Sequence, residues 1–267
     1  VALLLFVFNA DRMAEMFVGA MCAVGTLNVN PYGFPALLAQ MAVFFLAAAW
    51  LAVNHVDTRA PDYPLVRIKY ALLLILLPAL LLSFGLQLKY FLNLRADVIT
   101  SCCGSLFSGD AKGLAAEVAA LKPAPAMVLF YATLAVATGL TFRHARTGRG
   151  GYAAAAASVA AFAATLIGVL SFVSLYIYEH PNHHCPFCIL KPEYGHQGYW
   201  LYVPLFAATA AGLGVGALQP FRQVASLRAI VPAVSARLAR VAAIGYLLVA
   251  AIASWFVLHS NLILIEH

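Results

Sequence analysis

Two pairs of cysteines are the side chains of this 267-residue chain with the clearest capacity for chemistry. Cys102 and Cys103 are adjacent, and Cys185 and Cys188 enclose Pro-Phe in a Cys-Pro-Phe-Cys motif. Paired thiols can exchange electrons through disulfides, staple loops together, or hold a soft metal ion. The types and spacing of these residues therefore predict thiol chemistry, and leave its kind open.

The Cys-Pro-Phe-Cys motif predicts a reactive thiol at the start of a helical turn. Pro186 suits the first position of a helix, because the N–H that it lacks is not needed there. We therefore expect Cys185 beside unbonded backbone N–H groups, which stabilise a thiolate, with His183 and His184 adding positive potential. Cys185 is then the exposed nucleophile, and Cys188, one turn later, is the resolving thiol.

The adjacent cysteines call for a different interpretation. A disulfide between neighbouring residues closes a strained ring, and strain makes such a bond easier to reduce. Cys102 and Cys103 are therefore expected to relay electrons, to cross-pair with Cys185 or Cys188, or to ligate a metal ion together. A pair of structural disulfides between loops, in a membrane subunit of a larger complex, is the simplest alternative.

A soft-metal site is the second chemical hypothesis. Zn(II) takes four sulfur or nitrogen ligands, whereas Cu(I) accepts two or three soft ligands. Hg is a further thiophilic candidate, and a metallochaperone would be the corresponding partner. The candidate ligands are Cys102, Cys103, Cys185 and Cys188, with His183 and His184 in reserve.

Composition identifies the scaffold that must position these cysteines as membrane-embedded. The chain is 64% hydrophobic and 10% charged, and its mean hydropathy is +0.89. Apolar runs without charged residues are long enough to cross about 30 Å of hydrocarbon as helices. The sequence predicts an all-α, polytopic membrane bundle of about seven helices, forming a single domain over residues 1–267. The first run, 1–8, is partial, and the six complete runs are 34–54, 70–88, 125–142, 152–178, 199–219 and 241–260.

Positive charge predicts the orientation of the bundle. Ten of the sixteen Lys and Arg residues fall near one set of alternate loops, which should be cytoplasmic. The cysteine-bearing loops, 9–33, 89–124 and 179–198, and the C-terminus should then be extracytoplasmic, facing the periplasm from an inner (plasma) membrane. The basic balance is explained by contact with the anionic lipid bilayer, so no nucleic-acid partner is expected.

Two short helices are expected within the outer loops. Residues 11–24 have apolar side chains at three- and four-residue spacing, which predicts an amphipathic interfacial helix. Residues 111–121 follow a capping Ser-Gly-Asp and predict a second helix. The methionines near Cys22 could bind Cu(I), but we interpret them as packing residues. Tyrosines around the Cys-Pro-Phe-Cys motif are interpreted as interfacial anchors.

The Cys-Pro-Phe-Cys motif and the second cysteine pair resemble those of membrane thiol oxidases of the disulfide-bond-formation B and vitamin K epoxide reductase type. The resemblance covers about twenty residues, and it implies electron exchange between the two pairs, a quinone cofactor and a periplasmic thioredoxin-like partner. Those families have four or five spans, and their second pair is not vicinal. Vicinal cysteines are also similar to those of mercury-uptake membrane proteins. The leading hypothesis is a quinone-linked thiol–disulfide oxidoreductase, in which Cys185, Cys188, Cys102 and Cys103 are catalytic.

Overall fold

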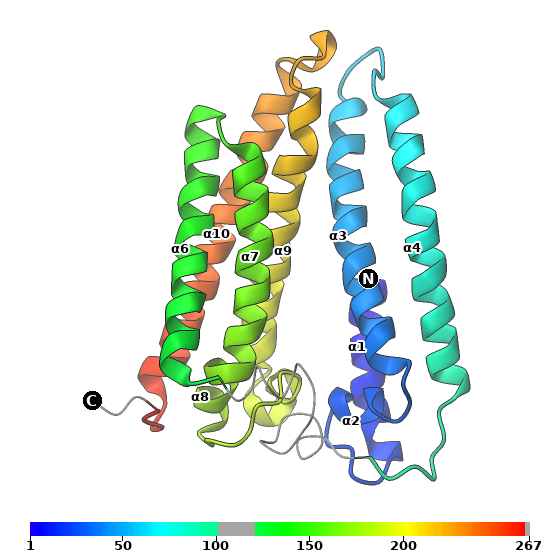
Figure 1. Cartoon of the computed structure of the whole chain (residues 1–267), viewed down its shortest axis with the longest axis vertical. Helices are drawn as coiled ribbons and strands as arrows, with labels where there is room; N and C mark the ends of the chain where they lie inside the picture. Colours follow the sequence, from blue (N-terminus) through cyan, green and yellow to red (C-terminus); the bar gives the residue numbers. More distant parts are fainter. Residues whose placement is uncertain (101–120, 265–267) are drawn as a thin grey trace.

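The computed structural model describes residues 1–100 and 121–264, and within these ranges every regular element is helical (Figure 1). Six helical segments in the described part of the chain are long and apolar enough to cross a membrane. The chain is therefore a multi-pass membrane protein, and all six complete apolar runs are confirmed as helices. They are α3 (Gly33–Asp57), α4 (Val66–Leu92), α6 (Pro123–Thr147), α7 (Gly151–Gly168) continued by α8 (Ser174–Tyr178), α9 (Gln197–Leu218) and α10 (Ile230–His259).

The helices form two groups (Figure 1). In the four-helix group, α6, α7, α9 and α10 pack against one another. In the N-terminal helix group, α3 pairs with α4, while α1 (Ala2–Arg12) and the short α2 (Ala23–Leu27) pack beside α3. The partial run at residues 1–8 lies in α1. Gln40 donates from its side-chain amide to the Gln87 side chain at 2.6 Å, so the two polar groups inside the α3–α4 pair satisfy each other.

Side chains of α3 and α9 join the two helix groups at mid-height. Phe45 stacks on Phe206 with ring centroids 5.5 Å apart, and Phe44 meets Phe206 edge-on at the same distance. Phe162 of α7 completes the aromatic cluster at 4.9 Å from Phe45. Such aromatic pairs each stabilise packing by about 0.5–1.5 kcal/mol beyond their buried area. The groups are thus held together firmly at the middle of the bundle.

The loops at the two ends of the bundle differ in character (Figure 1). At the basic end lie the connections 58–65, 148–150 and 219–229, close to the ten clustered cations. At the cysteine end lie segments 13–32, 93–100 and 179–196, together with the end of α10. The predicted division into two sets of alternate loops is therefore present in the fold.

The amphipathic helix expected over residues 11–24 is wrong. After α1 the chain forms a single 3-10 turn (Met13–Met16), then runs irregularly to α2. Gly19 has φ +87°, and a Cβ there would overlap the Thr100 carbonyl oxygen. Thr100 packs directly on Gly19 and donates its N–H to the Val18 carbonyl at 2.9 Å, so this position requires a glycine. The helix expected over 111–121 lies, except for its last residue, outside the described residues.

Candidate metal centre

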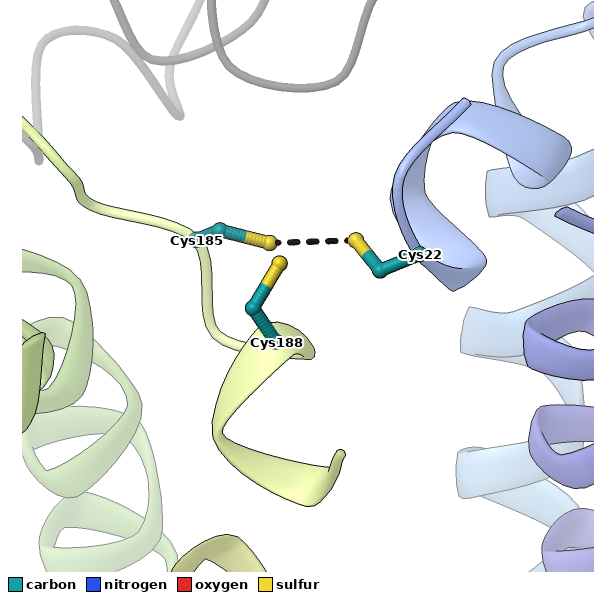
Figure 2. A group of neighbouring side chains, drawn as sticks. All are labelled: Cys22, Cys185 and Cys188. Atoms are coloured by element: carbon teal, nitrogen blue, oxygen red, sulfur yellow. Dashed lines mark hydrogen bonds between the residues drawn. The ribbon is translucent and has the colours of Figure 1, made fainter. Parts of the chain in front are cut away.

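Three cysteine sulfurs converge at the cysteine end (Figure 2). The Sγ atoms of Cys22, Cys185 and Cys188 all lie within 4.8 Å of one another. Cys22 and Cys185 are 163 residues apart in sequence, and their Sγ atoms are in hydrogen-bonding contact at 3.4 Å. The exposed fractions of the three side chains are 0%, 0% and 4%. Long-range folding thus creates a compact, buried three-sulfur cluster.

Hydrogen bonds of the residues that follow Cys22 fix its position. Cys22 is the residue before α2, and the adjacent Ala23 donates its N–H to the Asp11 carboxylate at 3.2 Å. Two residues further on, the Gly25 carbonyl accepts a hydrogen bond from the Thr100 hydroxyl at 2.9 Å. The segment around Cys22 is therefore tied both to the end of α1 and to the chain that leaves α4.

Two tyrosine hydroxyls hold the Cys-Pro-Phe-Cys loop. Tyr178, at the end of α8, donates to the Cys185 carbonyl at 2.5 Å, and Tyr202 of α9 donates to the Pro186 carbonyl at 2.8 Å. Successive backbone carbonyls are thus anchored from two different helices. These two tyrosines bind the loop directly, beyond the interfacial anchoring that the sequence suggested.

The helix start expected at Pro186 is wrong, and so is the exposure expected for Cys185. Pro186 and Phe187 form a turn, and a short 3-10 helix follows only at Cys188–Leu190. Phe187 packs against the buried side chains of the N-terminal helix group. Phe187 thus connects the loop to the N-terminal helix group, and the neighbouring Cys185 side chain is fully buried.

The two histidines before the motif lie outside the three-sulfur group. Nδ1 of His184 is 2.7 Å from the Leu170 carbonyl, which only accepts, so this nitrogen is the donor. Leu170 belongs to a π turn (Val169–Val173) between α7 and α8. The His183 ring lies 4.0 Å from the Tyr178 ring, and its Nε2 is buried without a hydrogen-bond partner. Neither histidine joins the cluster, although both offer a nitrogen nearby in sequence.

The surroundings of the sulfurs are apolar and aromatic. The packing neighbours in the described residues are Val24, Phe34, Leu170, Tyr178, Phe187 and Tyr194. Burial in apolar surroundings favours the neutral thiol over the thiolate. A soft cation that replaces the thiol protons supplies the missing positive charge, so this pocket suits metal ligation better than an uncompensated thiolate.

Loop 179–196 is also tied to the chain after α10. The exposed Glu179 carboxylate accepts hydrogen bonds from the backbone N–H and the side-chain amide of Asn261, both at 2.9 Å. Both bonds lower the pKa of Glu179, and the bond from the backbone N–H has the larger effect. The depressed pKa means that the contact stabilises the fold above the ordinary carboxyl range, and that this stabilisation is lost as the pH falls through the lowered value.

The sequence-predicted residues have different outcomes. Cys185 and Cys188 are brought together, as the motif implied, whereas Cys102 and Cys103 lie outside the described residues. Cys22 was absent from the predicted ligand set, and the structure adds it. Its sequence signals are its place in a loop on the same side as the motif and the methionines near it, which we interpret as packing residues.

Fold and site together define a polytopic helical membrane protein with a buried cysteine cluster at one end of the bundle. Comparisons with known protein families, with curated proteins and with solved structures found no match. The function must therefore be inferred from the cluster itself.

Proposed function

We propose that this membrane protein binds a soft metal ion through Cys22, Cys185 and Cys188. The observation that carries the proposal is the convergence of three buried sulfurs within 4.8 Å. Metal–sulfur bonds of about 2.3 Å place the sulfurs of a shared ion roughly 4 Å apart. The observed spacing needs only small side-chain movements to reach that geometry.

Cu(I) is the ion that this cluster suits best. Cu(I) accepts two or three soft ligands, so the three thiolates are sufficient. Zn(II) would take a fourth ligand, for which the sequence offers Cys102, Cys103, His183 or His184. Hg(II) also favours thiolates, and it belongs in the same test. As an ion binds, each ligating thiol releases its proton to solvent.

Thiol–disulfide exchange is the second candidate function, and the Cys22–Cys185 contact favours it. The Sγ of Cys22 lies 3.4 Å from the Sγ of Cys185 and is positioned to attack a Cys185–Cys188 disulfide. That exchange forms a Cys22–Cys185 disulfide and releases the Cys188 thiolate. In this second function, Cys102 and Cys103 would relay electrons from the cluster to a quinone, as the sequence predicts. The burial of Cys185 argues against direct attack by a soluble thioredoxin-like partner, because that partner could not reach the sulfur without movement of the loop.

Anaerobic titration of the reduced, detergent-purified protein with Cu(I), against a competing chelator, tests metal binding. We expect a single tightly held Cu(I) per chain. Cys185→Ser and Cys188→Ser should each lower the affinity by at least about tenfold, because each removes one ligand of a three-sulfur shell. Ser158→Ala, which removes a buried hydroxyl in α7, is the control and should bind like the wild type. The metal proposal would be overturned if the protein retained none of Cu(I), Zn(II) and Hg(II).

Differential alkylation with mass spectrometry separates the two candidates. If the cluster holds a metal ion, the three cysteines should become reactive when a chelator is added, with no reductant required. If the cluster exchanges disulfides, a Cys185-containing disulfide should instead open with mild reductant, and chelator should have no effect. The same experiment maps the pairing of Cys102 and Cys103.

A further inference from the structure

The three sulfurs come from different helix groups. Cys22 belongs to the N-terminal helix group, whereas Cys185 and Cys188 belong to the loop between α8 and α9 of the four-helix group (Figure 2). The two groups already touch at mid-height through the phenylalanine cluster around Phe206. Near the basic end, Val56 of α3 packs in one buried cluster with Val231 of α10. The cysteine cluster is thus a third contact between the groups, at the opposite end.

The two ligands of the four-helix group are pre-arranged as a pair. Cys185 and Cys188 share one short loop, which Tyr178 and Tyr202 hold through backbone carbonyls. Two thiolates are sufficient to hold Cu(I). Cys22 is therefore the separable ligand, because it reaches the site only when the N-terminal helix group is packed in place.

We infer that Cys22 couples occupancy of the metal site to closure between the two helix groups, an inference that rests on the proposed metal-binding function. The ion binds the Cys185–Cys188 pair, and Cys22 adds the third sulfur when the groups close at the cysteine end. The third thiol loses its proton to solvent as its sulfur–metal bond forms. By linkage, closure raises the affinity for the ion by the same factor by which the ion favours closure.

Phe187 gives this coupling a mechanical connection. Its side chain, between the two paired cysteines, packs against the buried residues of the N-terminal helix group as well as against the cysteine cluster. Movement of the N-terminal helix group away from the loop would separate Cys22 from Cys185 and expose Phe187 together. Packing of Phe187 against the N-terminal helix group therefore favours ligation by Cys22, and ligation by Cys22 favours that packing.

Cu K-edge X-ray absorption on copper-loaded protein counts the sulfur ligands. We expect three sulfurs in the wild type and two in Cys22→Ser, which should still bind Cu(I). The affinity of Cys22→Ser should fall about 5- to 150-fold, the usual range of coupling between linked equilibria. Val24→Ala is the matched control, because it trims a buried neighbour of the cluster in the same segment and keeps all three sulfurs.

Amide hydrogen exchange with and without Cu(I) tests the coupling itself. In the wild type and in Val24→Ala, Cu(I) should slow exchange in α2 and in the start of α3. In Cys22→Ser, Cu(I) should bind without that protection. Three sulfurs, or unchanged protection, in Cys22→Ser would overturn the coupling while metal binding stands. A wild type that takes up none of Cu(I), Zn(II) and Hg(II) would instead overturn the proposed function.

Discussion

At the scale of single residues, the Tyr178 hydroxyl links a membrane helix to the backbone of Cys185, one of the proposed metal ligands. Its hydrogen bond to the Cys185 carbonyl is the shortest constraint on the motif. Tyr178→Phe should lower the Cu(I) affinity by about tenfold, since an uncompensated buried carbonyl costs roughly 1–3 kcal/mol and the loop gains freedom. Competition titration against a Cu(I) chelator measures this change.

The control for Tyr178 is another tyrosine of the same bundle. Tyr131 shares a 2.9 Å hydrogen bond with Ser254, between α6 and α10. Tyr131→Phe should lower the thermal stability by about as much as Tyr178→Phe does, and it should leave the Cu(I) affinity unchanged. Equal losses of affinity in both variants would show that Tyr178 acts only through general stability.

Local sequence was informative about one half of the site. The Cys-Pro-Phe-Cys spacing predicts that the two thiols lie close together, and in the structure their Sγ atoms are within 4.8 Å of each other. Cys22 could not be predicted, because its approach depends on the turn at Gly19 and on contacts with Thr100, both set by packing between distant segments. The position of His144 beside a basic loop likewise suggests exposure to solvent, yet it is buried and its Nε2 is hydrogen-bonded to Ser235 at 2.8 Å.

At the scale of elements, a buried ion pair closes the α3–α4 turn. Lys69 Nζ lies 2.8 Å from the fully buried Asp57 carboxylate, whose other oxygen accepts the Leu65 N–H at 2.6 Å. Lys69 is one of the ten cations near the basic loops, and this contact gives it a structural role. Asp57→Asn should destabilise the fold by about 3 kcal/mol, because it removes the partner of the largely buried Lys69 ammonium and leaves that charge uncompensated. Equilibrium unfolding in mixed micelles measures that loss.

Asp62→Asn is the control for the same turn. Asp62 is exposed, so its replacement should change the free energy of unfolding by less than about 0.5 kcal/mol. If the two variants unfolded alike, the ion pair would contribute nothing to the stability of the turn.

The helices themselves were predictable because the membrane imposes their length. An uncharged apolar run must satisfy its backbone hydrogen bonds internally, so each run became a helix. The helices extend beyond the runs where polar ends remain helical, as at Val66–Leu92. The π turn at Val169–Val173 could not be predicted, because nothing in the apolar pattern distinguishes it from regular helix.

At the scale of the whole molecule, the concentration of positive charge at one end predicts the orientation in the membrane. The basic end should remain in the cytoplasm and the cysteine end should face the periplasm, since Lys and Arg resist translocation. Fusions ending at Gly148 should give a fluorescent cytoplasmic reporter, and fusions ending at Asn182 should give an active periplasmic phosphatase. Fusions ending at Glu179 and at Asn261 should both give the periplasmic signal, because these two residues are hydrogen-bonded to each other. The opposite reporter pattern would place the cluster in a reducing compartment, where thiolate ligation of a metal could persist but stable disulfides would not.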